Sequence, residues 1–219
     1  MIAITDFVDR VSPDILGAPN KLITECIRDV IIRFCAETWV LQRGFGATVS
    51  SINTALNNAA TISLTGITDL EEVKPIGVIS LLINDYEYQM KMLKVVNHID
   101  TIADNTTIKY FYFDDSSSYD IIICPMTIGD IINAVFAVTP TLDATYVDTI
   151  LYDTWLEALV AGSKAKLLLM PKKSWTDPQL ANLYMKEYRT GVNNARRQSR
   201  KEFTKARTSV NPRSDEVWQ

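Results

Sequence analysis

Apolar residues recur at every third or fourth position across residues 20–42, and this is the strongest periodic pattern in the chain. The spacing predicts an amphipathic helix with one buried stripe. Asn20 is a favourable N-cap residue for its start, and we expect Arg43-Gly44-Phe45-Gly46 to end it. The predicted stripe consists of Ile23, Ile27, Val30, Ile31, Phe34 and Thr38.

The pattern changes over residues 48–140, which are rich in Ile, Val, Thr and Tyr and are broken by turn residues. Runs of this composition predict strands. Asn84-Asp85 predicts a two-residue hairpin connection, and residues 114–118 predict another turn. Residues 94–102 fit either a short helix or an irregular crossover. The predicted strands cover residues 61–64, 76–83, 86–92, 107–113, 119–124 and 132–138.

Helical periodicity returns over residues 146–170. Small residues on this helix would let another helix approach closely. Thr176 or Asp177 is placed to cap the next helix, with Pro178 in its first turn. We expect the apolar stripe of that helix to fail beyond Gly191. The small residues on the first of these helices are Ala158, Ala161, Gly162 and Ala165.

Together these elements predict an α+β fold. We expect a small helical bundle with long helices near residues 20–42, 146–170 and 178–200, into which a β-rich subdomain is inserted. By this division, residues 1–46 and 146–195 form the bundle, residues 47–145 form the β-rich insert, and residues 196–219 form an extended basic arm.

The net charge of −4 conceals a strong asymmetry along the chain. Residues 163–219 contain thirteen Lys or Arg against five Asp or Glu, whereas residues 1–162 contain nine against twenty-one. An acidic body with a basic end indicates that the basic end binds a partner. The candidate docking residues in the arm are Arg196, Arg197, Arg200, Lys201, Phe203, Lys205, Arg207 and Trp218.

Three roles for the arm remain open from its residues. The favoured one is docking in a groove of a partner protein, with Phe203 and Trp218 as apolar anchors and the arginines paired with carboxylates. The second is binding of nucleic acid through phosphates, although the acidic body would repel DNA and only Phe203 is available for base stacking. The third is a solvated tail without a partner.

The sequence offers little for catalysis, so we expect no enzyme activity, cofactor or metal. His98 is the single histidine, and the cysteines Cys26, Cys35 and Cys124 lack zinc-site spacing and are expected in the core. The start of the chain does not have the pattern of a signal peptide, and no apolar run has membrane-spanning length. Several carboxylates could in principle hold a divalent ion, but their spacing is more typical of solvated charge on turns and helix faces. They are Asp114, Asp115, Asp120, Asp148, Asp153 and Glu157.

Two segments resemble the head-to-tail adaptor, or connector, proteins of tailed bacteriophages. The first is ITDFVDRVSPDILGAPNKLITECIRDVIIRFCAETWVL, in which Arg28, Asp29, Phe34, Cys35, Glu37 and Trp39 fit the family pattern. The second is LLLMPKKSWTDPQLANLYMKEYRTGVNNARRQSRK, which departs from the pattern at Ser174, where we expect proline before Trp175. The residues that fit in the second segment are Met170, Pro171, Trp175, Asp177, Pro178, Tyr184, Tyr188, Gly191, Ala195 and Arg196.

The resemblance implies a structural virion protein at the head–tail junction, made in the host cytoplasm. Such proteins form a ring, commonly of twelve copies, beneath the portal. By this resemblance the helical core forms the ring, the C-terminal arm docks between portal subunits, and the β-insert faces a tail or nozzle protein. DNA would pass through the lumen without being read, and no membrane would be involved.

Overall fold

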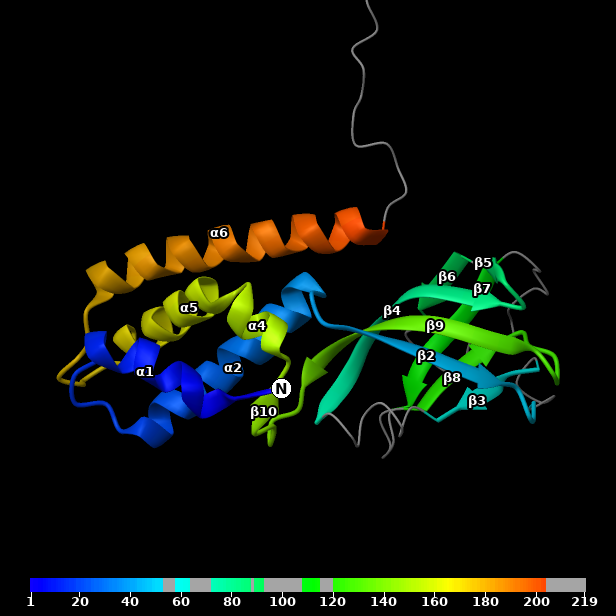
Figure 1. The fold of residues 1–219 in the computed structure, drawn as a ribbon, viewed down its shortest axis with the longest axis horizontal. Coiled ribbons are helices and arrows are strands. Elements are labelled where there is room, and N and C mark those ends of the chain that lie inside the picture. The colour runs from blue at the N-terminus through cyan, green and yellow to red at the C-terminus, as the bar shows by residue number, and fades with distance from the viewer. Residues whose placement is uncertain (53–57, 64–71, 88, 93–107, 115–119, 204–219) are drawn as a thin grey trace, which may run out of the picture.

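The structure, a computed structural model, describes residues 1–52, 58–63, 72–87, 89–92, 108–114 and 120–203. It mixes helices and strands, which confirms the predicted α+β class. Helices gather at one end of the molecule and the two larger sheets at the other (Figure 1). The longest helix, at the C-terminal side, lies across the outside of the helical end.

The N-terminal part leads into the helix predicted over residues 20–42. It comprises β1 (Ile2–Ala3), η1 (Ile4–Phe7), α1 (Val8–Val11), η2 (Ser12–Asp14) and α2 (Asn20–Thr38). All six residues of the predicted α2 stripe are buried, which confirms the pattern.

The helix begins at Asn20, as predicted, but its N-cap is Pro19, whose extended backbone suits that position, and not Asn20. The predicted end of the helix was wrong. The helix ends at Thr38, because Trp39 adopts a left-handed conformation with φ of 57° and ψ of 32°. This turn places the Trp39 ring over Gly77, where an added Cβ would lie 3.1 Å from the ring.

Two four-stranded sheets make up the other end. One has the order β2 (Gln42–Thr48), β9 (Ile131–Pro140), β4 (Val73–Ile83) and β5 (Tyr86–Glu87). The second has the order β3 (Ala60–Ile62), β8 (Asp120–Cys124), β7 (Ile108–Asp114) and β6 (Gln89–Met92). The β6–β7 pair is parallel, and the other neighbours in these sheets are antiparallel.

Strand β2 replaces the helix stop expected at residues 43–46. Half-buried Arg43, Phe45 and Ala47 alternate with exposed Gly44 and Gly46, so the segment has the period of a strand. The Phe45 ring packs 6.1 Å from the Phe136 ring on β9, measured between centroids. Sequence reasoning mistook the glycines for a helix terminator because glycine marks both contexts.

The predicted hairpin at Asn84-Asp85 is confirmed, since both residues have positive φ and Ile83 pairs with Tyr86. The strand predicted over residues 86–92 is divided between two sheets, with β5 ending at Glu87 and β6 beginning at Gln89. The segment 94–102 and most of the turn at 114–118 lie outside the described residues.

The prediction of a single helix over residues 146–170 was wrong. Tyr146–Val147 forms β10, which pairs with β1, and the chain then folds into α4 (Thr149–Asp153) and α5 (Leu156–Leu168). Asp148 caps α4 by accepting a hydrogen bond from the Ile150 N–H at 3.0 Å. Trp155 interrupts the helical path with φ of −117° and ψ of 10°.

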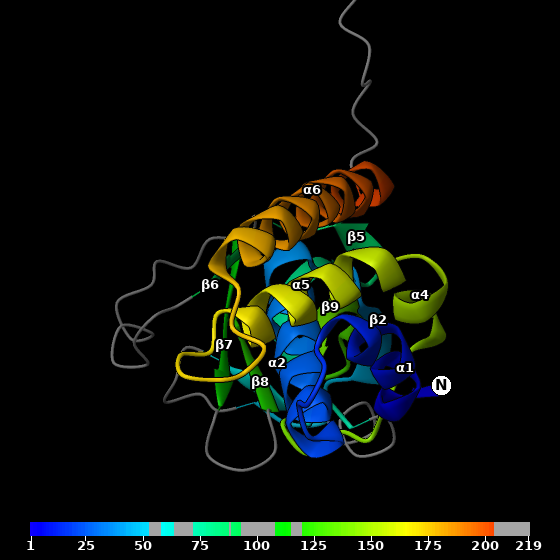
Figure 2. The ribbon, with the colours of Figure 1, turned by 90° about the vertical axis from the view of Figure 1, so that its left-hand side faces the viewer.

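The last described element is α6 (Pro178–Phe203), which packs on α5 and also contacts α2. Figure 2 views the helical end along its length, with α6 above α5 and α2 beneath them. The core between these helices contains an aromatic cluster in which the Phe34 ring lies 5.8 Å from Trp155 and 6.3 Å from Tyr188. All three cysteines are buried, as predicted.

Candidate docking surface on the C-terminal helix

The start of α6 is fixed by the residue predicted to cap it. The Asp177 carboxylate accepts hydrogen bonds from the N–H groups of Gln179 and Leu180, both at 3.0 Å. Pro178 occupies the first helical position, where no backbone N–H is needed. The cap prediction is therefore confirmed for Asp177.

Close contact with α5 then fixes the direction of α6. A Cβ added to Gly191 would lie 2.3 Å from the Cβ of Ala158. A Cβ added to Gly162 would lie 2.6 Å from the Tyr188 ring and 2.8 Å from Val30. The predicted close approach at the small residues of α5 is confirmed, and it leaves α6 little freedom to tilt.

The buried stripe of α6 continues past Gly191, which corrects the expectation that it fails there. Val192, Ala195 and Ser199 are 4%, 0% and 6% exposed. The Ser199 hydroxyl donates a hydrogen bond to the Ala195 carbonyl at 3.0 Å and so is satisfied within the helix. The stripe was missed because its residues are small, so that they add little to a hydrophobic pattern.

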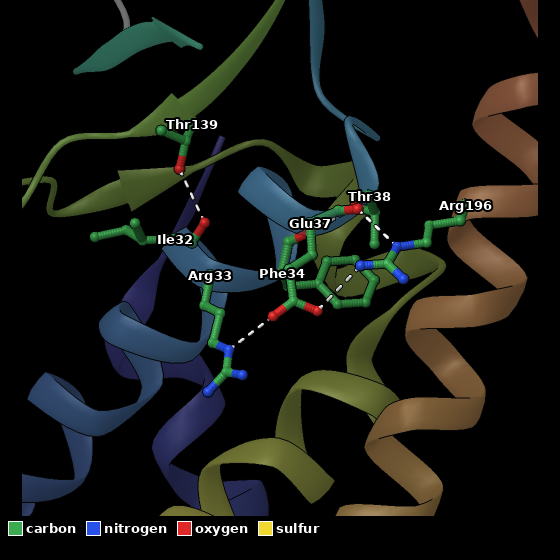
Figure 3. Close-up of polar contacts among 7 residues, drawn as sticks. All are labelled: Ile32, Arg33, Phe34, Glu37, Thr38, Thr139 and Arg196. Atoms are coloured by element: carbon green, nitrogen blue, oxygen red, sulfur yellow. Dashed lines mark hydrogen bonds and ion pairs between the residues drawn. The ribbon is translucent and has the colours of Figure 1, made fainter.

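Arg196 connects α6 to the C-terminal end of α2 (Figure 3). Its Nε donates to the Glu37 carbonyl oxygen at 2.8 Å, and its Nη2 lies 3.5 Å from Glu37 Oε2. Arg33 approaches the same carboxylate, with Nε 2.7 Å from Oε1. A cation at a helix C-terminus also interacts favourably with the carbonyls there.

The same turn of α2 contacts strand β9. The Thr139 hydroxyl donates to the Ile32 carbonyl at 3.2 Å, and the Thr38 hydroxyl donates to the Phe34 carbonyl at 2.7 Å (Figure 3). The end of α2 is therefore the point where α6 and the first sheet meet.

Burial and charge perturb the titration of groups at this junction. Burial raises the pKa of Tyr188 to about 12, and the neighbouring Glu37 carboxylate acts in the same direction. The hydrogen bond to Glu37 raises the pKa of Arg33. The Tyr188 phenol is consequently neutral and the Arg33 guanidinium charged at ordinary pH.

The predicted arm residues are distributed over three environments. Arg196 contacts the body, and Arg197 is exposed on α6. Arg200, Lys201 and Phe203 belong to the last turns of α6, so the first residues of the predicted arm are helical. The remaining candidates, Lys205, Arg207 and Trp218, lie outside the described residues.

Sequence reasoning missed the structural use of Arg196 and the contribution of the body to this surface. Exposed Arg189 lies seven residues before Arg196, and Arg33 lies four residues before Glu37. The seven-residue spacing between Arg189 and Arg196 could have indicated that the two residues lie on one face of α6. The approach of α2 to α6 depends on tertiary packing and had no sequence signal.

Other features show no chemical site among the described residues. A groove of about 490 Å³ lies between the start of α5 and α6, lined by residues including Trp155, Glu157, Glu187 and Gly191. Asp148 pairs with Arg43 at 3.0 Å, and over the described ranges His, Cys, Asp and Glu form no cluster suited to a metal ion. His98 and Asp115 fall outside those ranges.

The helices that the structure describes are all too short or too polar to cross a membrane.

No protein-family model matches the chain, and no curated protein matches it significantly.

Proposed function

We propose that this protein is a structural adaptor that forms a ring between the portal and the tail of a tailed bacteriophage. In this proposal the helices of residues 1–46 and 146–195 are the bundle that forms the ring. Residues 47–145 are the inserted β-rich subdomain on the side of the tail or nozzle protein. Residues 196–219 are the arm that docks on the portal, and the ring holds twelve copies.

The observation that carries the proposal is the way α6 joins the body to the basic segment. Helix α6 is anchored at its start by Asp177, along its length by Gly191 and near its end by Arg196. It continues to Phe203 and so delivers the basic residues that follow from a fixed direction. Such an arrangement suits docking, because a pre-ordered helix loses less conformational entropy on binding.

The proposed role is mechanical and requires no catalytic residue, cofactor or metal. Each arm contact need only be modest, because several arms on one ring raise the effective concentration of the others. Neighbouring subunits in a ring meet through a heterologous interface that closes. The acidic body would line a channel that lets DNA pass without holding it.

Truncation after Phe203 tests the proposal. Residues up to Ser199 pack on the body, so the truncated chain should fold with unchanged helix content. We expect it to bind the portal ring more weakly than the full chain does, because it lacks Lys205, Arg207 and Trp218. Portal binding equal to that of the full chain would contradict arm docking.

The rival function is nucleic-acid binding through the same basic segment, which rests on the charge of residues 163–219. It predicts salt-dependent binding to duplex DNA that is lost when Arg196, Arg197 and Arg200 are replaced by Ala. No duplex binding at low salt would remove it.

A further inference from the structure

Four exposed arginines lie on α2 and α6, and two of them, Arg33 and Arg196, meet at Glu37. Arg33 comes from α2, and Arg189, Arg196 and Arg197 come from α6. Arg189, Arg197 and Arg33 are exposed, and the Arg196 side chain is 45% exposed. We refer to these four residues as the α2–α6 arginine patch.

Glu37 joins the two helices at the centre of the patch. Its Oε1 contacts Arg33 and its Oε2 contacts Arg196, while its carbonyl oxygen accepts from Arg196 Nε (Figure 3). One carboxylate thus holds two guanidiniums in a set relative position. Two guanidiniums share this one carboxylate in the ion pairs found among the described residues, so the patch keeps an excess of positive charge.

The guanidiniums keep donors available for a ligand. Arg33 uses Nε toward Glu37, and its side chain remains 71% exposed. Arg196 uses Nε and Nη2, which leaves Nη1. A guanidinium fixed in this way presents its remaining N–H groups in the fork geometry that matches a carboxylate.

Helical geometry extends the patch along α6. Arg189 and Arg196 are seven residues apart, so they fall on nearly the same face, about 20° apart in angle. Arg196 and Arg197 are also the first residues of the predicted docking arm. The patch therefore overlaps the start of that arm.

We infer that the α2–α6 arginine patch binds carboxylates of an acidic protein surface, so that docking begins on the folded body and not at the arm alone. The inference rests on the proposed function, in which that surface belongs to the portal. Charge complementarity identifies the partner chemistry, and the fixed guanidinium pair favours carboxylates held on a folded surface. A long DNA duplex fits less well, because residues 1–162 carry twelve more acidic than basic residues and would repel it.

The test compares two double variants of the full chain. Arg33→Gln with Arg189→Gln removes two charges from the patch but leaves the predicted arm intact. Arg10→Gln with Lys21→Gln removes two charges from exposed positions on α1 and α2, and Lys21 lies about 18 Å along α2 from Arg33. Binding to the purified portal ring is measured at several salt concentrations, and circular dichroism verifies folding of each variant.

We expect the patch variant to bind the portal roughly tenfold more weakly and with a shallower salt dependence, while the control variant binds as the unmodified chain does. Equal binding by both variants would overturn the inference and leave the proposed function standing. An unmodified chain that does not bind the portal would overturn both. Duplex DNA bound by the unmodified chain as tightly as the portal, and lost in the patch variant, would assign the patch to nucleic acid instead.

Each arginine is also replaced alone, since Arg33→Gln removes a contact to Glu37 and Arg189→Gln does not. Weakened portal binding by Arg189→Gln, in a chain of unchanged thermal stability, supports the inference without disturbing the junction. Unchanged binding by Arg189→Gln limits the patch to the Glu37 junction and contradicts its extension along α6.

Discussion

Gly191 on α6 and Ala158 on α5 are in direct contact, so that a Cβ on Gly191 would lie 2.3 Å from the Cβ of Ala158. This separation is far below a van der Waals contact, and glycine is the residue that allows it. The contact sets how closely α6 approaches the body and therefore where Arg196 meets Glu37. This small pair is one of the contacts that set the position of the helix carrying the predicted arm.

Substitution Gly191→Ala is expected to destabilise the protein. Overpacking against Ala158 costs about 1–3 kcal/mol, and the better helix propensity of alanine offsets about 1 kcal/mol of this. The free energy of unfolding, measured with urea, should fall. Gly44→Ala is the matched control, because nothing lies within 4 Å of its Cβ position, and a comparable loss in both variants would contradict the packing argument.

Glu37 and Arg196 should be energetically coupled. A double-mutant cycle with Glu37→Gln and Arg196→Gln is expected to give a coupling of about 0.5–1 kcal/mol at low salt, because both groups are partly exposed. The coupling should shrink as salt is added, since screening weakens partly exposed pairs. Unfolding curves at two ionic strengths measure the coupling. If the two single substitutions change the free energy of unfolding additively at low salt, the contact contributes nothing to stability.

Asp177 should stabilise α6 as its N-cap. Asp177→Ala leaves two N–H groups at the helix start without their acceptor and is expected to lower the free energy of unfolding by about 1 kcal/mol. Asp177→Asn keeps an acceptor oxygen and should lose much less. Thermal unfolding ranks the two variants, and equal losses from both would argue that the charge, not the cap, matters.

Tyr188 should make stability depend on pH at the alkaline end. Its pKa is raised to about 12 in the folded protein, so the neutral phenol is favoured there, and the contribution is complete below pH 10. This contribution is lost as the pH rises toward 12, when the unfolded chain ionises first. Unfolding measured between pH 9 and pH 12 should show a shallower decline for Tyr188→Phe.

The same Tyr188→Phe variant tests the buried hydroxyl at neutral pH. The hydroxyl is buried and has no hydrogen-bond partner among the described residues, so its removal is expected to leave stability unchanged or to raise it by up to about 1 kcal/mol. Tyr184→Phe is the contrast, because the Tyr184 hydroxyl donates to Asp14 at 2.7 Å. A clear loss of stability in Tyr188→Phe would reveal a partner for that hydroxyl.

Long periodic patterns and local caps could be predicted from the sequence. The stripe of α2 is large and regular, and the Asp177 cap and the Asn84-Asp85 turn depend on residues within a few positions. These features depend on residues close together in the chain, so they can be predicted from one sequence without knowledge of the tertiary structure.

Features decided by distant partners could not be predicted. Strand β2 exists because β9 pairs with it, and β10 exists because β1 lies beside it. Arg196 was assigned to the arm by its charge, yet its place is set by Glu37, which lies 159 positions earlier in the chain. Charge patterns alone do not distinguish an arginine that binds a partner from one that fixes a helix.

Single-particle imaging of the purified chain, alone and mixed with the portal ring of the same phage, tests the central proposal most directly. The adaptor account predicts rings, or portals capped by this protein with density from each subunit running into the portal from the end of α6. Monomers that leave the portal uncapped would contradict it.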